Sequence, residues 1–368
     1  MKHSLAMGVL ALTACKASAP TSSTPNSGAP FVLRPEGGSP QPPPRAISAV
    51  SAPAIVPVAP GPEQLTAKPL ALPGATPPVS VDYIVYDRGH ARVWVPVGDT
   101  GSVDVLDVAS GAFSRIDGFK TSEREVRGRK RMMGPSAAAV GEGVVYVGNR
   151  ASNEVCPVDS STLKVGNCLK LSSPTDGVAY VASAKEVWVT TPHDQSLTVL
   201  DASTPATMKH KTTIQLDGAP EGYAVDDSRG LFFTNLEDKN LTIAIDVKTH
   251  KPTGSPWKPD CGPDGPRGIA ADISRGFVYV ACTDHVQVLD ASNGGIPLGK
   301  LYTGAGVDNI DWLETHRLLY IGAARAAKIT IARVDDRGQP TVVATGTSAE
   351  GSRNPVADAS GNAYVVDP

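Results

Sequence analysis

Aromatic residues and long apolar runs are scarce in this 368-residue chain, and each shortage argues against a class of protein. Phe, Trp and Tyr make up 5% of the residues and the formal net charge is −3, which argues against a dedicated nucleic-acid-binding protein. The apolar run from Leu5 to Leu12 is too short to span a bilayer. No Gly-x-Ser-x-Gly, His-Glu-x-x-His or phosphate-loop motif occurs, so no catalytic residue is assigned.

Cysteine is also sparse, with five residues and no Cys-x-x-Cys motif. Zinc ribbons, thiol redox chemistry and c-type haem therefore lack support, and no cofactor is expected. Cys156 and Cys168 lie in neighbouring predicted strands, and Cys261 and Cys282 flank the start of a repeat. We expect two local disulfides, Cys156–Cys168 and Cys261–Cys282, formed in an oxidising compartment.

What the chain does contain is a repeat. An aromatic residue sits in a short apolar run at intervals of 41 to 52 residues: Trp94, Tyr146, Trp188, Phe232, Tyr279, Tyr320 and Tyr364. An Asp follows each of the first five by 11 to 14 residues: Asp107, Asp159, Asp201, Asp246 and Asp290. Each unit reads as four short strands with turn formers between them, and the Asp is expected to form the turn into the fourth strand. A period near 44 residues made only of strands is typical of a β-propeller.

The segments Val144-Val145-Tyr146-Val147-Gly148-Asn149 and Leu197-Thr198-Val199-Leu200-Asp201-Ala202 resemble the YVTN-repeat β-propellers. The resemblance spans residues 79 to 368 and lies in the periodicity more than in any one copy. It implies an all-β, seven-bladed propeller of four-stranded antiparallel blades, often exported and frequently without assigned chemistry.

The last repeat has only two predicted strands before Pro368, so N-terminal strands are expected to close the final blade. Lys68 to Pro73 is assigned as its outermost strand, and Ala54 to Val58 as its third strand. A truncated C-terminus is the alternative.

The N-terminus resembles a bacterial lipoprotein leader. Residues 1–14 form the expected signal peptide, and Leu12-Thr13-Ala14-Cys15 resembles a lipobox in which Cys15 is lipidated. An ordinary signal peptide is the alternative. Residues 15–65 are rich in Pro, Ser and Ala and are expected to be a disordered tether, followed by the propeller at 66–368. The expected location is the cell envelope, on the periplasmic or surface face, and Lys16 after the Cys favours the outer membrane.

The residues that enter each innermost strand are expected to converge at one mouth of the axial channel. Aligning the repeats places seven polar residues there: Asp176, Glu221, Arg267, Asp308, Asn309, Arg353 and Asn354. Asp82 is expected near the equivalent position of the first repeat. Such a convergent polar set predicts a ligand site. The alternative is mutual ion pairing around ordered water, for example of Glu221 with Arg267.

A metal-dependent hydrolase is the second functional hypothesis. Six-bladed propellers of the gluconolactonase type hold a divalent cation with Glu, Asn and Asp side chains. Glu221, Asp308, Asn309 and Asn354 would imitate that set around Ca²⁺, with Asp176 as a base. Arg267 and Arg353 would repel a cation, and an anionic or zwitterionic ligand suits them at least as well.

A long basic connection separates the first two repeats, from Phe119 to Met133. Its cluster Arg127, Arg129, Lys130 and Arg131 is suited to anionic lipid, polysaccharide or a partner protein. It would equally form a solvated loop or a lid over the mouth. The sequence thus predicts a lipid-anchored propeller that acts as a binding or scaffold module for a small ligand or an envelope protein, rather than as an enzyme.

Overall fold

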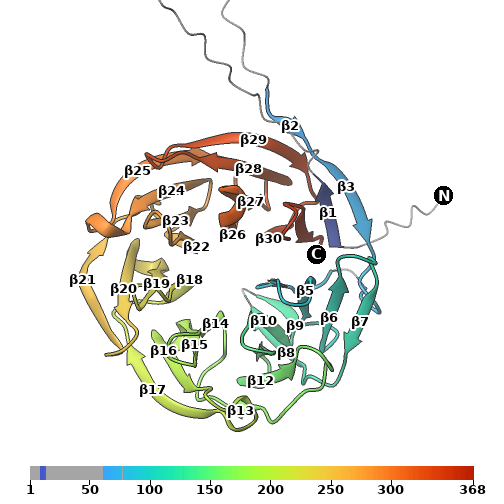
Figure 1. Ribbon diagram of the computed structural model, residues 1–368. Helices are drawn as coiled ribbons and strands as arrows, with labels where there is room; N and C mark the ends of the chain where they lie inside the picture. The colour runs from blue at the N-terminus through green and yellow to red at the C-terminus, as the bar shows by residue number, and fades with distance from the viewer. Residues whose placement is uncertain (1–8, 14–60, 77, 127) are drawn as a thin grey trace, which may run out of the picture. The chain divides into compact units, whose positions relative to one another are not determined.

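The computed structural model describes residues 9–13, 61–76, 78–126 and 128–368, and its regular structure is almost entirely β-strand. The sheets stand in a ring around a central axis (Figure 1). The innermost strand of each sheet contacts the innermost strands of its two neighbours, and β30 contacts both β26 and β4. The ring is therefore closed, as the repeat predicted.

Six sheets have four antiparallel strands, and in five of these the strands follow one another in chain order from the axis outward. The five are β4(Val85–Asp87), β5(Arg92–Val97), β6(Ser102–Asp107), β7(Phe113–Ile116); β10(Pro135–Val140), β11(Val144–Asn149), β12(Glu154–Asp159), β13(Leu169–Lys170); β14(Val178–Val181), β15(Glu186–Thr191), β16(Ser196–Asp201), β17(Lys209–Gln215); β18(Pro220–Asp226), β19(Leu231–Leu236), β20(Leu241–Asp246), β21(Lys251–Trp257); and β22(Pro266–Asp272), β23(Phe277–Cys282), β24(His285–Asp290), β25(Ile296–Tyr302).

A further sheet has five strands: β26(Val307–Leu313), β27(Leu318–Ala323), β28(Lys328–Val334), β29(Pro340–Thr347) and β2(Glu63–Gln64). Strand β2 pairs in parallel with β29, with Glu63 opposite Ala344 and Gln64 opposite Thr345. The prediction of seven four-stranded antiparallel blades is therefore wrong. The described residues form six such blades, because the segment before β3 adds a parallel strand to the neighbouring sheet.

The sixth four-stranded blade joins the two ends of the described chain. Its order from the axis outward is β30(Arg353–Ala357), β31(Ala363–Val366), β1(Val9–Thr13) and β3(Thr66–Leu70). N-terminal strands close the blade as predicted, and β3 overlaps the predicted outermost strand. The third position is occupied by β1, whose apolar residues pair with β31 on one side and β3 on the other. The segment predicted for that place, Ala54 to Val58, lies outside the described residues.

The repeated aromatic residues fill the spaces between blades. Six of them are at most 1% exposed, and Tyr364 is 4% exposed. The aspartates that follow them form turns, because Asp107, Asp159, Asp201, Asp246 and Asp290 each accept a backbone N–H from two or three residues further on. The turn prediction is confirmed, and the buried aromatics together with these turns explain why each repeat folds as one blade.

The basic connection forms a hairpin of its own, β8(Ser122–Val126) and β9(Arg129–Met133). Five short 3-10 turns complete the described elements: η1(Pro192–Asp194), η2(Pro205–Thr207), η3(Glu237–Lys239), η4(Ala291–Asn293) and η5(Glu314–His316). None of the helices in the described part of the chain is long and apolar enough to cross a membrane.

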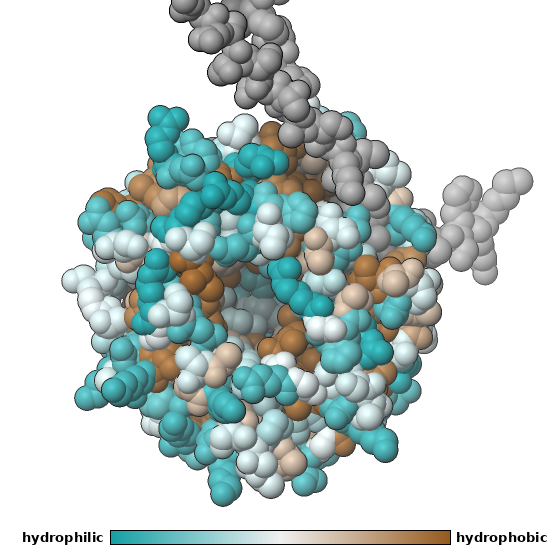
Figure 2. Space-filling view, viewed as in Figure 1, coloured by the Kyte–Doolittle hydropathy of each residue, from teal (hydrophilic) through white to brown (hydrophobic). Residues whose placement is uncertain are grey.

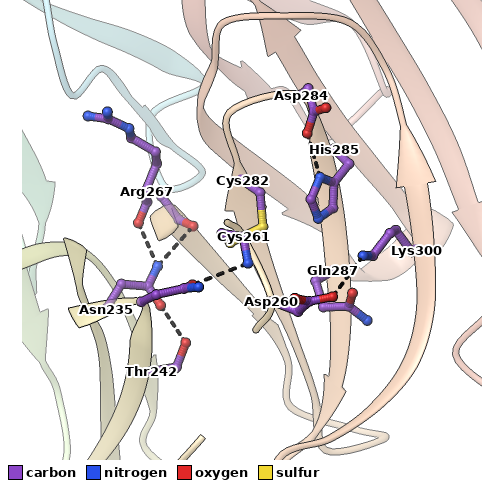
Figure 3. Close-up of a disulfide and its surroundings, with 12 residues drawn as sticks. Asn235, Thr242, Asp260, Cys261, Arg267, Cys282, Asp284, His285, Gln287 and Lys300 are labelled. Carbon is purple, nitrogen blue, oxygen red and sulfur yellow. Dashed lines mark hydrogen bonds and ion pairs between the residues drawn. A yellow bond between two sulfur atoms is a disulfide. The ribbon is translucent and has the colours of Figure 1, made fainter. Parts of the chain in front are cut away.

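Both predicted disulfides are present, Cys156–Cys168 and Cys261–Cys282. The second ties the segment before β22 to the end of β23, where one blade begins (Figure 3). In the same region Asn235 donates its amide to the carbonyl of Arg267 at 2.6 Å, while its own oxygen accepts the Thr242 hydroxyl at 2.6 Å. These bonds fix the backbone of Arg267 at the start of its inner strand.

Candidate mouth of the axial channel

The polar residues predicted to converge do lie near one another at the starts of the inner strands. Glycine makes this approach possible. Gly222 has a φ of +67°, and a Cβ built on it would lie 2.7 Å from the Cα of Gly268. A Cβ on Gly268 would lie 2.1 Å from the Asn309 side-chain oxygen. Neighbouring inner strands therefore meet backbone to backbone, which brings the side chains of successive blades together.

Asn354 occupies the corresponding place in the closing blade with a φ of 59°, a left-handed conformation that Asn tolerates better than most residues. Its side-chain oxygen accepts the backbone N–H of Asn309 at 3.0 Å. Its amide donates to both the carbonyl and the carboxylate of Asp82, each at 2.9 Å. Asn354 thus links three blades, and its polar atoms are used in doing so.

Arg150 holds two of the carboxylates at the mouth. It follows β11, and its guanidinium lies 3.0 Å from the Asp82 carboxylate and in contact with the Asp176 carboxylate. Burial opposes the charge of Arg150, but the carboxylates of Asp176 and Asp82 outweigh that effect and raise its pKa. Sequence alignment of inner strands missed this residue, because it comes from the end of a second strand. The antiparallel hairpin returns that end to the same mouth.

The two predicted arginines pair with different partners. Arg353 lies 2.9 Å from the Asp308 carboxylate, so these two predicted site residues meet. Arg267 lies 2.7 Å from Glu237, which belongs to η3. The suggested pairing of Glu221 with Arg267 is therefore wrong, since the Glu237 carboxylate takes that guanidinium.

Glu221 differs from the other acids at the mouth because it has no ion-pair partner among the described residues. Its carboxyl accepts a hydrogen bond from the Tyr83 hydroxyl at 3.3 Å. Burial raises its pKa well above the usual range, and the nearby carboxylates of Asp176, Asp308 and Asp82 raise it further. The Glu221 carboxyl therefore keeps its proton to a higher pH than an exposed glutamate does.

The pKa values of Asp176 and Asp308 are also raised. Burial raises the pKa of Asp176 to about 6, although the guanidinium of Arg150 acts against the rise. Burial also raises the pKa of Asp308, against the effect of Arg353. The mouth therefore holds an excess of carboxyl groups over the cations available to pair with them. Such shifts are a frequent mark of functional sites, although structural ion-pair networks also cause them.

A cavity of about 320 Å³ adjoins these residues along the axis. Tyr83, Tyr223, Asn309 and Asn354 line one part of it, and Arg88 and Asp311 line another. The rings of Tyr83 and Tyr223 are stacked with their centroids 5.8 Å apart. Figure 2 shows a hollow at the centre of the face that it draws. The cavity is thus of ligand size and is lined by tyrosine, asparagine, arginine and aspartate residues, while Glu221 and the ion pairs of the mouth lie beside it and not in its lining.

The predicted metal set is engaged in other contacts. Asp308 is paired with Arg353, Asn354 bridges Asn309 and Asp82, and Glu221 accepts from Tyr83. Within the described ranges, no group of three or more His, Cys, Asp or Glu residues is arranged to hold a metal ion.

The basic cluster is described only in part. Arg127 lies outside the described residues, as does the predicted lipid attachment site, Cys15. Arg129 belongs to β9. Lys130 lies 2.7 Å from Glu123 on the same hairpin. Arg131 lines a cavity together with Arg353, so the hairpin lies beside the mouth.

No protein-family model matches this sequence, and no curated protein matches it. Solved structures do. A chain of hydrazine synthase from Kuenenia stuttgartiensis matches with a TM-score of 0.56 and 15% identity, over 68% of this chain and 76% of that one. The RRP9 WD40 repeats match with a TM-score of 0.61 and 11% identity, over 78% and 93%.

Virginiamycin B lyase from Staphylococcus aureus matches with a TM-score of 0.59 and 10% identity, over 79% of this chain and 95% of that one. At these identities the likeness concerns the fold alone. By its architecture, this chain is a β-propeller similar to those of the WD40 proteins.

Proposed function

We propose that this propeller is a binding module whose small-molecule ligand docks at the axial mouth. The observation that carries the proposal is Glu221, a carboxyl held by the Tyr83 hydroxyl and surrounded by three further carboxyl groups. Leaving an acid in such a place costs free energy unless a ligand uses it. The aromatic rings beside it and the 320 Å³ cavity provide a surface for that ligand.

The charges favour a ligand with an ammonium group. Asp82, Asp176 and Asp308 face Arg150 and Arg353, so the paired groups leave one negative charge even when Glu221 is protonated. An ammonium group beside Glu221 would favour ionisation of its carboxyl, and the ring of Tyr83, whose hydroxyl contacts that carboxyl, attracts cations. A carboxylate on the same ligand would be met by Arg353. The class that fits is a zwitterion such as a free amino acid.

The proposal is tested by calorimetric titration of free amino acids in two buffers with different ionisation enthalpies. Binding should release a proton, because the ammonium group lowers the pKa of Glu221. In the variant Glu221→Gln this proton release should disappear. The affinity for the amino acid should fall about tenfold, which corresponds to the loss of one charge-assisted hydrogen bond. Glu142→Gln is the matched control, since Glu142 is exposed and its nearest cation is Lys185, 3.9 Å away. Unchanged binding by a Glu221→Ala, Asp308→Ala double variant would rule out this site.

We further propose that the protein is an exported, lipid-anchored envelope protein related to the YVTN-repeat propellers. The leader-like residues 1–14, the Cys at position 15 and the two disulfides support this location. Cleavage before Cys15 would remove β1, so the closing blade of the mature chain would need another third strand. Labelling of growing cells with radioactive palmitate should mark the wild-type protein and leave Cys15→Ser unmarked. Equal labelling of both, or of neither, would contradict the anchor.

The hydrolase hypothesis has less support. A Ca²⁺ site would need Glu221, Asp308, Asn309 and Asn354 to turn their oxygens toward one point, and three of these side chains are held in other contacts. A panel of lactones and esters, assayed with and without added Ca²⁺, is the direct test. Metal-dependent turnover that is lost in Asp176→Asn would favour the enzyme over the binding module.

A further inference from the structure

A second cavity lies under the basic hairpin, next to the axial one, and Ile84 lines both. It has a volume of about 620 Å³ and is bounded by β9, by residues 78–81 and by the C-terminal residues of the closing blade. We call it the hairpin groove. Its size falls within the range of sites that enclose a small organic molecule.

One side of the hairpin groove is strongly basic. Residues 122–133 contain five basic side chains and two acidic ones, Glu123 and Glu125. Lys130 and Arg131 line the groove, and both are exposed. Arg131 has no ion pair or hydrogen bond with any residue that the structure describes. Asp99 is the acidic member of the lining, and its carboxylate accepts the backbone N–H of Ser80. The Asp99 carboxylate offsets part of the Arg131 charge, but no described residue forms an ion pair with that guanidinium at contact distance, so it can receive an anionic group.

The opposite side is apolar. Val79, Ile84 and Val366 are between 4% and 7% exposed and form the floor, and Met132 is 37% exposed at the edge. Pro78 and Pro368 also line the groove, and neither offers a backbone N–H. An extended peptide would find few donors for its carbonyl groups on this floor, whereas a hydrocarbon chain needs none.

We propose that the hairpin groove binds a long-chain carboxylate, with its head at Arg131 and its alkyl chain along Val79, Val366 and Met132. The basic residues of the hairpin outnumber its acidic ones and favour an anion, and the exposed guanidinium of Arg131 matches the fork of a carboxylate. The apolar floor supplies the remaining free energy through burial of the chain. This ligand differs from the small polar one proposed for the axial mouth, although Arg353, which is paired with Asp308 at the mouth, also lines the hairpin groove.

The test is displacement of a fluorescent fatty acid from the full chain, below the micellar concentration. Palmitate should compete. Hexadecanol, which has the same chain without the charge, should compete at least tenfold more weakly, and butyrate, which lacks the chain, should not compete. Arg131→Glu should weaken palmitate binding at least tenfold. Arg337→Glu is the matched control, because Arg337 is an exposed arginine on another blade with a side chain that is 86% exposed.

Two further variants complete the test. Met132→Gln should weaken palmitate binding while leaving the charge intact, and Glu221→Gln should leave it unchanged. Equal competition by hexadecanol, or an unaltered affinity in Arg131→Glu, would overturn the proposal. Adsorption of the protein to vesicles of anionic phospholipid without any binding of monomeric palmitate would overturn it as well, because the hairpin would then act as a membrane-surface patch.

Discussion

The hydroxyl of Tyr83 donates a hydrogen bond to the carboxyl of Glu221 at 3.3 Å, although the two residues are 138 positions apart in the chain. Tyr83 precedes the first blade, and Glu221 begins the inner strand of another. Burial raises the pKa of Tyr83 well above its usual value, and the Glu221 carboxyl raises it further. Burial and the neighbouring carboxylates therefore favour the protonated form of both groups in this pair.

Glu221 should make the folded protein less stable as pH rises. Its pKa is higher in the folded state than the value of 4.5 expected when it is unfolded, so the folded state binds its proton more tightly. The contribution to stability is complete below pH 4.5 and is lost as pH increases through the folded pKa. Glu221→Gln removes this loss.

Urea unfolding of wild type and Glu221→Gln between pH 5 and 9 measures the effect. The difference in unfolding free energy should shift in favour of the variant as pH rises. Asp176 and Asp308 contribute slopes of the same sign, but they are present in both proteins. A constant difference across this range would show that Glu221 titrates normally.

Removing Arg150 should destabilise the protein by about 2 kcal/mol. The carboxylates of Asp82 and Asp176 would then face each other without their shared cation. The pKa of Asp176, raised by burial to about 6, should rise further. Arg150→Ala is compared by chemical denaturation with Arg317→Ala, which breaks an exposed pair with Asp336 and should cost less than about 0.5 kcal/mol. Similar costs for both variants would contradict the bridging role.

A second buried acid, Glu186, should matter for stability rather than binding. It accepts hydrogen bonds from Trp188 Nε1 at 2.8 Å, Lys211 Nζ at 2.5 Å and His250 Nε2 at 3.0 Å. Glu186→Gln supplies one acceptor oxygen where two are used, so at least one donor loses its partner. We expect a loss of about 2–3 kcal/mol in urea unfolding. Glu154→Gln is the control, because the partner of Glu154, Lys120, is exposed. Equal losses of unfolding free energy in the two variants would show that the hydrogen bonds of Glu186 stabilise the fold no more than an exposed ion pair does.

When residues 1–14 are deleted, the segment at residues 54–58 should take the place of β1 as the third strand of the closing blade. Residues Ile55-Val56-Pro57-Val58-Ala59 match Val155-Cys156-Pro157-Val158-Asp159 of β12, including the proline. Ala59 also precedes Thr66 by seven positions, the separation of the paired residues Leu106 and Phe113. The truncated chain should therefore still fold and show a cooperative thermal transition.

The variant Val56→Asp shows whether residues 54–58 or β1 supply the third strand of the closing blade. It should lower the melting temperature of the chain lacking residues 1–14 and leave the full chain unaffected, because there β1 fills the position. A truncated chain that is insensitive to this substitution would show that residues 54–58 do not replace β1.

Periodicity allowed most of the fold to be predicted, because each blade is encoded locally by an aromatic residue and a turn-forming Asp. It also aligned Asp176, Glu221, Asp308 and Arg353, since equivalent positions in repeats face the same axis. Arg150 was missed because it lies outside the aligned inner strands. The pairing of Arg267 was wrong because Glu237 comes from a 3-10 turn that the alignment did not consider.

The ends of the ring were harder to predict for a different reason. Val9 to Thr13 has the composition of a leader, and a strand that pairs with residues more than 350 positions away leaves no local signal. The parallel addition of β2 to β29 involves two residue pairs and no recognisable motif. Both features depend on which unpaired edge is available once the blades have formed.

Strands β2 and β3 follow each other directly in the chain, but β2 belongs to the sheet of β26–β29 and β3 to the closing blade. Residues 63–70 therefore cross the seam at which the ring is completed. Tension applied along the chain ahead of Pro62 would load the two pairs of β2 first, and β3 only after they had parted. Under mechanical force the seam should yield stepwise, with the hydrophobic interior of the blades still intact when β2 is released.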